Sequence, residues 1–588
     1  MNNNLIFNID NNDVSSIFFF LLEHRSDIVT TYSYKERDYV AKLLYKVLGI
    51  SHKLQPRIIE LTAIIYKWLP LKNREFLCDT IWNIANSKSD SPSHVVSVCN
   101  FIWINFRTIN RTNQIKANEI LAYLRMSVKP ELKETVLHTI NSIHFTFKRT
   151  VRANPEVILL VPEFLTGLSF VQPPIGLMLS AGILDKYEIH SDILDNRVYH
   201  YDEKTLCKKL KDYSIIVVNT TPIDQVQNYF VDYRFDLTIQ LLKRIRHTYP
   251  TKTIIICGSH GSVKPEIIEK FNVADFIIRG EYDYQLPNLV KAIHNNLSYN
   301  TIPNISYRKD GKYIRTVDDN MLAHPELDNK YFPDYKKIHL DQYYGNVHYK
   351  NVNVKRINWS ILMTSRGCPY QCSFCYKFFG NSVRSYSIEH VMKDLENMHN
   401  VGVTDFFIID QLFTSNEDYL IRLCDSIQEL PYRFNWSCQT RIDKINHRML
   451  EAMKNAGCKA IWLGVESVDD RVLAQNKKGI SKKKILECLK IIKEANIEFN
   501  VFFMLGMMGD TTQSIDAIKD FIISYNLPCT KSIMICTPRY GTEMGNYAIK
   551  EYNLKCDNFS ILNNYKGVVN NQVTQDYINK TIEELSTR

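Results

Sequence analysis

The alternation of short apolar segments with amphipathic ones constrains the fold of this chain most strongly. In the middle of the chain, β-branched or aromatic residues dominate four such segments, at residues 157–161, 215–218, 254–256 and 276–278. Helical patterns, around residues 174–184 and 235–247, lie between some of them. Buried strands that alternate with helices are typical of a parallel, doubly wound sheet. The sequence therefore predicts an α/β domain over residues 151–300.

Polar loops that carry small residues follow the predicted strands. They read Asn219-Thr220-Thr221, Cys257-Gly258-Ser259-His260 and Arg279-Gly280-Glu281. Ligands of doubly wound sheets bind outside the carboxyl ends of the strands, where these loops lie. Small residues such as Gly258 let a ligand approach the backbone closely. The candidate binding residues of this domain are Thr220, Thr221, Gly258, Ser259, His260, Gly280 and Glu281.

A second alternating region lies at residues 351–545. Its apolar segments include residues 361–363, 406–409, 460–463 and 499–505. Amphipathic segments again separate them, as at residues 388–398 and 482–495. This pattern predicts a partial α/β barrel of the (β/α)6 type, with its chemistry at the carboxyl ends of the strands.

The remaining residues complete the predicted domain organisation. Residues 1–150 are predicted to be helical, since apolar residues such as Val40, Leu43 and Leu44 recur at helical spacing. Residues 301–350 are predicted to be a connector with a hairpin turn at Asp310-Gly311. Residues 546–588 form a polar C-terminal segment. The predicted fold class is thus α/β, with a helical N-terminal domain, a Rossmann-like doubly wound domain and a partial barrel.

Composition limits the kinds of partner. The chain has 588 residues, a formal net charge of +9 and 14 cysteines. Its basic residues are spread out, so we expect no nucleic-acid surface. The apolar segment 17–22 is far shorter than the about 20 residues of a membrane-spanning helix, and acidic residues precede it, unlike in a signal peptide. We expect a cytoplasmic protein without membrane contact, in which many cysteines indicate metal or redox chemistry rather than disulfides.

Three closely spaced cysteines, Cys368, Cys372 and Cys375, form the most specific motif. Thiolates at this spacing can bind one face of a [4Fe–4S] cluster and leave one iron without a protein ligand. A structural zinc site is disfavoured because it would need a fourth ligand, and the next cysteine is Cys424. The other cysteines, Cys438 among them, are predicted to be small buried core residues.

The motif resembles that of the radical S-adenosylmethionine (SAM) superfamily, C-x3-C-x-aromatic-C, with Phe374 at the aromatic position. The resemblance extends from residue 358 to about 545. Its further matches, in order, are Arg366-Gly367, Asp410-Gln411-Leu412-Phe413, Trp436–Arg441, Gly464-Val465-Glu466-Ser467 and residues 505–510 and 537–542. Gln411 replaces an acid of the family's D-D-x-F turn, and the last two segments each lack a family proline.

The resemblance implies a cofactor arrangement. The open iron would bind the amino and carboxylate groups of SAM, and one electron from the cluster would release a 5′-deoxyadenosyl radical. The residues that would contact SAM are Phe374, Ser437, Gln439, Arg441 and Glu466. The resemblance also implies an electron donor such as flavodoxin or ferredoxin.

The sheet at residues 155–300 resembles the cobalamin-binding domain of class B radical SAM enzymes. Thr220 and Thr221 would lie under the corrin and its tail, and Gly258, Ser259 and His260 would admit the tail. Many cobalamin domains carry D-x-H-x-x-G after the first strand, but the loop at residues 162–174 has no histidine. We expect the lower face of the corrin to be shielded by apolar side chains such as Phe164, Leu168 or Phe170, with His260 as a minor alternative ligand. A sheet used only for packing or for another nucleotide stays open.

These resemblances imply a cobalamin-dependent methyltransferase that acts on an unactivated carbon of a natural-product or peptide substrate. One alternative uses the same cofactors for ring contraction, cyclisation or rearrangement without methyl transfer. Another is a non-catalytic Fe–S protein. Methylthiolation of tRNA or protein is disfavoured, because residues 150–350 hold only Cys207 and Cys257 and cannot supply three further cluster ligands.

Overall fold

The computed structural model describes residues 34–48, 55–66, 69, 71–87, 91–105, 120, 124, 156–162, 172–220, 235–318, 327, 331–343, 345–349, 352–356, 359–528, 533–555 and 572–586. The predictions for residues 17–22, Phe164, Leu168, Phe170 and Thr221 lie outside these ranges. Two compact units make up the chain. The first consists of residues 1–149 and 344–357, and the second of residues 150–343 and 358–588.

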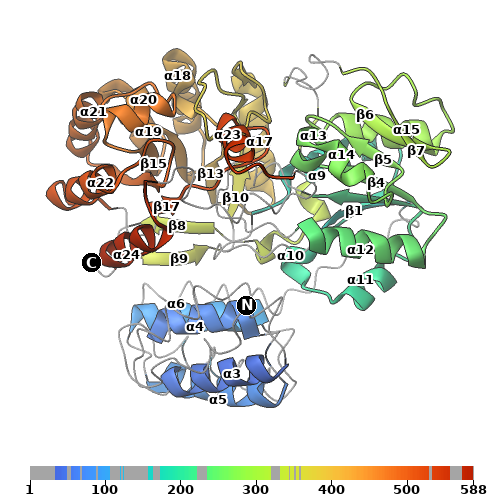
Figure 1. The fold of residues 1–588 in the computed structure, drawn as a ribbon, viewed down its shortest axis with the longest axis horizontal. Coiled ribbons are helices and arrows are strands. Elements are labelled where there is room, and N and C mark those ends of the chain that lie inside the picture. Colours follow the sequence, from blue (N-terminus) through green and yellow to red (C-terminus); the bar gives the residue numbers. More distant parts are fainter. Residues whose placement is uncertain are drawn as a thin grey trace. The chain divides into compact units, whose positions relative to one another are not determined.

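The first unit contains helices, drawn in blue in Figure 1, and one hairpin. Its described helices are α3 (Tyr34–Leu48), α4 (Gln55–Ile65), α5 (Leu71–Ser87) and α6 (Pro92–Asn105). Their apolar stripes are buried, as at Leu44, Ile58 and Phe101. The hairpin of β8 (Gly345–Tyr349) and β9 (Val352–Arg356) contacts α6 and so belongs to this unit.

The second unit begins with a seven-stranded sheet in the order β2-β1-β3-β4-β5-β6-β7. The parallel strands are β1 (Val157–Val161), β2 (Ser191–Asp195), β3 (Ile215–Asn219), β4 (Thr253–Cys257) and β5 (Phe276–Ile278). An antiparallel hairpin of β6 (Ile305–Lys309) and β7 (Lys312–Arg315) closes one edge. Both residues of its turn, Asp310 and Gly311, have positive φ, as the predicted two-residue turn requires. The parallel part has the doubly wound order 2-1-3-4-5.

The helices of this sheet follow the strands along the chain. They are α9 (Ile175–Lys186), α10 (Asn196–Tyr199), α11 (Glu203–Lys209), α12 (Phe235–Thr248), α13 (Ser259–Val263), α14 (Pro265–Glu269) and α15 (Gln285–His294). The strands β1, β3 and β5 are buried along their whole length, which explains their uninterrupted apolar sequences.

A six-stranded parallel sheet forms the rest of the second unit, and its strands are ordered as in the sequence. They are β10 (Trp359–Leu362), β13 (Asp405–Ile408), β14 (Asn435–Arg441), β15 (Cys458–Glu466), β16 (Glu498–Leu505) and β17 (Ile533–Ile535). The helices are α17 (Ile388–Asn400), α18 (Glu417–Gln428), α19 (His447–Asn455), α20 (Asp470–Gln475), α21 (Lys482–Glu494), α22 (Thr512–Ser524), α23 (Glu543–Glu551) and α24 (Gln575–Ser586). The predicted partial barrel is confirmed. No described helix has the length and hydropathy needed to cross a membrane.

Local sequence fixes where the barrel helices begin. A short polar side chain precedes seven of them and accepts a hydrogen bond from a backbone N–H in the first turn. These caps are Ser387, Asn416, Asn446, Asp469, Ser481, Thr511 and Thr542. Each such cap contributes about 1 kcal/mol and holds the loop before its helix, where the candidate site residues lie.

Candidate active site

The three cysteines lie in a loop that is closed at its base. Strands β11 (Ser365–Arg366) and β12 (Arg384–Ser385) pair antiparallel, with Arg366 opposite Arg384. Gly367 follows at a φ of +92°, and a Cβ there would collide with the carbonyl oxygens of Ser382 and Phe379. Only glycine therefore fits at this point, immediately before the first cysteine. We call residues 367–383 the cysteine loop.

The cysteine side chains differ in exposure. Cys368 is buried, and its backbone N–H donates to the Gly380 carbonyl at 3.4 Å. Cys372 and Cys375 are half-buried and pack against an apolar wall. The wall consists of Phe374, Val472, Met504, Met507, Met508, Cys536 and Met544. Within the described residues, no group of three or more His, Cys, Asp or Glu side chains is arranged to hold a metal ion.

A fixed cation faces one of the cysteine sulfurs. Nη1 of Arg441 lies 3.8 Å from Sγ of Cys372. The guanidinium is held by Asp443, with Nε to Oδ1 at 2.9 Å, and by the carbonyl of Lys478 at 2.6 Å. It also lies 3.7 Å from the ring centre of Tyr370. The thiolate is the form of cysteine that binds iron, and the guanidinium places a positive charge beside this sulfur. Since each thiolate of a [4Fe–4S] cluster binds its own iron, three thiols on one closed loop beside this cation fit that donor set.

Strand β14 places three predicted residues on one face. Residues alternate between faces along a strand, so Ser437, Gln439 and Arg441 share one side. Trp436 and Cys438 share the other, where both are fully buried. The prediction that Cys438 is a core residue is confirmed.

Glu466 ends β15 in an unusual conformation. Its φ is +71°, and the pairing register between β15 and β16 shifts at this residue. Its Oε1 lies 2.9 Å from Nζ of Lys478, and both side chains are nearly buried. Lys478 Nζ in turn lies 6.0 Å from the ring centre of Phe374. A strained non-glycine residue in a buried ion pair beside the cysteine loop is typical of a functional site. Sequence reasoning missed Lys478, because its partner lies 12 residues away.

Half-buried aromatic side chains line the same inner face of the barrel. Trp462 of β15 lies edge-on to Phe407 of β13, with ring centres 5.7 Å apart, and 5.5 Å from Phe502 of β16. In the parallel register, Trp462 lies opposite Gln439. Sequence reasoning counted these aromatics only as strand residues. The alternation of these aromatics with fully buried neighbours, such as Phe406 and Phe503, could have indicated that they face the interior of the barrel.

The ends of β3 and β4 hold the other predicted binding residues. Thr220 is buried, and its hydroxyl donates to the Cys257 carbonyl at 3.0 Å. Gly258 has a φ of 110° and precedes α13, which begins at Ser259. His260 is half-buried and stacks on Phe235, with ring centres 4.8 Å apart. Burial, together with the charge of Arg539, lowers the pKa of His260 to about 3, so its ring is neutral at physiological pH.

The structure brings the sheet end and the barrel end close together. Residues 539–541, which follow β17, lie between them. A Cβ at Gly541 would lie 2.8 Å from the ring of Tyr376, which follows Cys375 in the cysteine loop. It would also lie 3.2 Å from the side chain of Val263, the last residue of α13 at the sheet end. Arg539 of the same segment acts electrostatically on His260.

Gly280 and Glu281 follow β5 and contact protein groups. The Gly280 N–H donates to Oγ of Ser262 at 2.7 Å. Glu281 is fully buried, and its Oε2 lies 2.6 Å from Nη1 of Arg366. Its Oε1 pairs with Arg384. The predicted cofactor contact of Glu281 stays a prediction, whereas its ion pairs hold the base of the cysteine loop.

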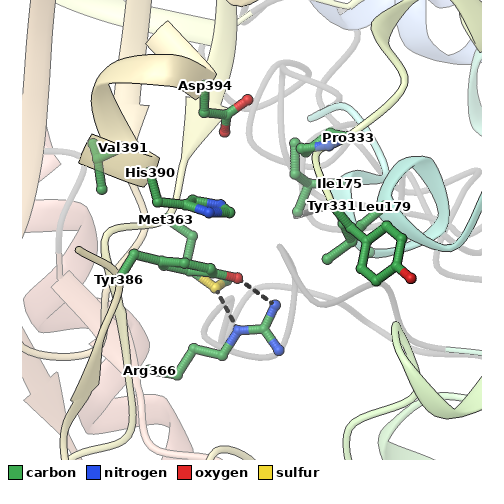
Figure 2. Close-up of a pocket in the computed structure, with 11 residues that line it drawn as sticks. Ile175, Leu179, Tyr331, Pro333, Met363, Arg366, Tyr386, His390, Val391 and Asp394 are labelled. Atoms are coloured by element: carbon green, nitrogen blue, oxygen red, sulfur yellow. Dashed lines mark hydrogen bonds between the residues drawn. The ribbon is translucent and has the colours of Figure 1, made fainter. Parts of the chain in front are cut away.

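A pocket lies between α9, residues 331–333 and α17 (Figure 2). It is small, because the centre of a water-sized molecule can occupy only about 30 Å³ of it. His390 lies between the rings of Phe332 and Tyr386, at 4.4 and 4.6 Å. Asp394 accepts a hydrogen bond from the Tyr335 hydroxyl at 3.2 Å, and burial raises the pKa of Asp394 to about 7. Arg366 forms one wall, so the pocket adjoins the base of the cysteine loop.

Comparison with known families identifies the barrel. Residues 362–522 match the family model described as the Radical SAM superfamily. The match includes the three cysteines and every barrel residue that was predicted to contact SAM. The radical SAM assignment predicted for these residues is confirmed.

Relatives and solved structures extend the comparison. An uncharacterised methyltransferase of Pyrococcus horikoshii is 25% identical over 402 residues, which cover 67% of this chain and 83% of that protein. An anaerobic magnesium-protoporphyrin IX monomethyl ester cyclase of Rubrivivax gelatinosus is 24% identical over 295 residues, or 48% and 50% of the two chains. The structure of TsrM from Kitasatospora setae, a radical SAM methyltransferase with cobalamin and a [4Fe–4S] cluster bound, gives a TM-score of 0.53 at 17% identity. That likeness covers 68% of this chain and 75% of TsrM and shows a shared fold.

Proposed function

We propose that this chain, whose residues 362–522 match the Radical SAM superfamily, is a cobalamin-dependent methyltransferase acting on an unactivated carbon of a small-molecule or peptide substrate. One observation carries the proposal. A closed loop with three cysteines faces Arg441 and the Glu466–Lys478 pair, and it lies in the same unit as a doubly wound sheet. The shared fold with TsrM, whose structure holds cobalamin and a cluster, supports the second cofactor.

The cysteine loop has the donors that a cluster needs. Cys368, Cys372 and Cys375 would each bind one iron, and the half-buried position of Cys372 and Cys375 leaves room beside the loop. When bound, the cluster supplies the electron that cleaves SAM, and cobalamin supplies the methyl group. The methionine-rich wall next to the loop would exclude water from that reaction.

Charged side chains around the loop suit the zwitterionic end of SAM. The Arg441 guanidinium, fixed by Asp443, can bind a carboxylate. Glu466 can accept a hydrogen bond from an amino group or a ribose hydroxyl, while Lys478 balances its charge. Ser437 and Gln439 add neutral hydrogen-bonding groups on the same face of β14.

The sheet end suits a large ligand that is recognised by shape. Gly258 and Ser259 have little side-chain volume, so a ligand can approach their backbone. The neutral His260 ring, stacked on Phe235, offers a flat surface without positive charge. Thr220 directly follows the end of β3, beside the switch point between β1 and β3 where doubly wound sheets bind ligands.

A second candidate function has a specific observation in its favour. The cyclase of Rubrivivax gelatinosus matches about half of this chain, and its named reaction closes a ring. Cyclisation or rearrangement with the same cofactors would change the product mass differently from methyl transfer. The mass of the product therefore separates the two functions.

The test begins with anaerobic reconstitution of the full chain with iron, sulfide and hydroxocobalamin, followed by reduction with flavodoxin or ferredoxin. We expect a bound [4Fe–4S] cluster, a bound corrin, and 5′-deoxyadenosine together with S-adenosylhomocysteine during turnover. A product heavier by one methylene unit supports methyl transfer. 5′-Deoxyadenosine without S-adenosylhomocysteine would favour the second candidate, and an intact cluster that never cleaves SAM would contradict both.

A further inference from the structure

Residues 280–284, which follow β5, are tied to the strand ends of the seven-stranded sheet. The Gly280 N–H donates to Ser262 of the segment that follows β4. The Tyr282 hydroxyl is fully buried and accepts a hydrogen bond from Asn219, the last residue of β3, at 2.6 Å. These hydrogen bonds therefore attach the segment to the strand ends where the sheet would bind its ligand.

The intervening side chains of the same segment point to the cysteine loop. Asp283 is fully buried, and its carboxylate oxygens lie 3.2 Å from Nη1 and 2.5 Å from Nη2 of Arg366. Glu281 bridges Arg366 and Arg384. These two arginines are opposite each other in the β11–β12 pair that closes the cysteine loop. The two carboxylates thus hold both strands at the base of the loop.

The network is a closed set of charges. Two carboxylates meet two guanidinium groups, so the buried charges cancel. Burial alone would lower the pKa of Arg366, but Asp283 and Glu281 hold it well above its ordinary range, so the guanidinium stays charged. The rings of Tyr284 and Phe379 lie 5.9 and 5.5 Å from it. Buried ion pairs contribute little net stability compared with apolar packing, but their fixed geometry specifies one arrangement.

We propose that Glu281 and Asp283 are positioning residues that fix the cysteine loop, and the cluster it would carry, relative to the ligand-binding strand ends of the sheet. The inference rests on the proposed function, since it assumes that the loop holds a cluster. It differs from a direct contact between Glu281 and cobalamin, because both carboxylate oxygens of Glu281 face arginines. In this arrangement, the distance between the two cofactor sites depends on the ion-pair network.

The test compares Glu281→Gln with Asp275→Asn in the full chain. Asp275 lies immediately before β5, at the end of the strand opposite to Glu281. Its carboxylate is likewise shared by two arginines, Arg246 at 2.6 Å and Arg308 at 2.7 Å. Three measurements apply to each variant. They are hydrogen exchange of the amides of residues 367–383 without cofactors, the electron paramagnetic resonance spectrum of the reduced cluster with and without SAM, and the amount of corrin retained after reconstitution.

We expect Glu281→Gln to speed exchange in the cysteine loop at least tenfold and to alter the cluster spectrum and its response to SAM, while corrin is retained. Asp275→Asn should leave all three measurements unchanged. Glu281→Asp, which keeps the charge, should restore the spectrum in part. If Glu281→Gln does not fold, Asp283→Asn takes its place, because the Glu281 ion pairs stay intact in that variant.

The outcomes separate this inference from the proposed function. A wild-type protein that assembles no cluster would overturn both. A wild-type cluster whose spectrum and loop exchange are unchanged in Glu281→Gln would overturn only the positioning role. Loss of corrin from Glu281→Gln with an unaltered loop would instead assign Glu281 to a direct cofactor contact.

Discussion

The side chains at the carboxyl ends of the parallel strands differ in charge between the barrel and the seven-stranded sheet. At the barrel end, buried charges meet in fixed pairs, such as Glu466 with Lys478 and Arg441 with Asp443. At the sheet end, the candidate residues other than Glu281, whose carboxylate is paired with two arginines, are small or neutral, and His260 is uncharged above a pH of about 3. Fixed charges select the charge of a ligand, whereas neutral, close-fitting surfaces select its shape. The difference suits a zwitterion at the barrel and a large flat ligand at the sheet.

The largest expected effect comes from the ion-pair network that joins the two ends. Arg366→Met removes the guanidinium shared by the buried Glu281 and Asp283. Removing one partner of a buried ion pair typically costs about 3–5 kcal/mol, so we expect a loss of that size in the free energy of unfolding. Urea unfolding of the full chain measures it.

Arg308→Met is the matched control. Arg308 pairs with Asp275, and both side chains are about a quarter exposed. Such a pair contributes about 1 kcal/mol or less. Equal losses in the two variants would mean that the network between the two ends is no more important than a surface ion pair.

A second prediction concerns the carboxylate behind the loop base. Asp410 accepts hydrogen bonds from Thr364 and Ser365, next to Arg366, and none of these donors is a cation. Burial raises the pKa of Asp410 to about 6. The folded state therefore binds the proton more tightly than the unfolded state does. The contribution of Asp410 to the free energy of unfolding consequently falls as pH rises from about 4 to about 6. The loss amounts to about 3 kcal/mol.

Asp410→Asn removes the charge; its amide oxygen can still accept from the Thr364 N–H, and its NH2 group can donate to the Thr364 and Ser365 hydroxyls, which accept as well as donate. We expect the variant to match the wild type near pH 4 and to exceed its free energy of unfolding above pH 6. Unfolding by urea at several pH values measures the difference. A pH slope that the substitution leaves unchanged would show that the pKa of Asp410 is the same in the folded and unfolded states.

His260 should show the opposite pH dependence at the sheet end. Its pKa is lowered to about 3, so the unfolded state binds the proton more tightly. The stability contributed by the neutral ring is complete above about pH 6.5 and is lost as pH falls toward 3. Because the ring is only half-buried, we expect about 2 kcal/mol, which is less than the full shift implies.

His260→Phe keeps the stacking on Phe235 and cannot be protonated. We expect it to lose less stability than the wild type between pH 7 and pH 4. The free energy of unfolding at these two pH values measures the effect. Equal losses in both proteins would mean that His260 becomes protonated in the folded state, and the sheet end would then not be a neutral surface.

The fold was largely predictable, because most strands are continuous apolar segments and the cysteine spacing is specific. The edge strand β2 was not predicted. Its sequence, Ser-Asp-Ile-Leu-Asp at residues 191–195, is polar in three of five positions, as suits a strand with one free edge. The polar face of β14 was predictable from alternation alone.

The pairing of charges at the site was not predictable. Arg366 and Glu281 are 85 residues apart, and their pairing depends on how the sheet and the barrel pack within one unit. The sequence correctly predicted that Glu281 follows a strand end, but it did not predict in which direction the side chain points. A strand-end position follows from local pattern, whereas the partner of a buried charge follows from tertiary structure.

The smallest effect concerns the cation at the barrel end. Arg441 lies 3.8 Å from the sulfur of Cys372, and a positive charge there favours the reduced, more negative cluster. We expect the contact between Arg441 and the Cys372 sulfur to favour the reduced cluster over the oxidised one about tenfold. Arg441→Gln then lowers the reduction potential of the cluster by about 59 mV. Lys444→Gln is the control, because this substitution removes an equal charge near the same tyrosine. The Lys444 Nζ lies 5.7 Å from the ring centre of Tyr370. A potentiometric titration that gives equal shifts for both variants would attribute the effect to net charge. A shift confined to Arg441→Gln would assign it to the fixed pair of Arg441 and Cys372 that distinguishes the barrel end from the sheet end.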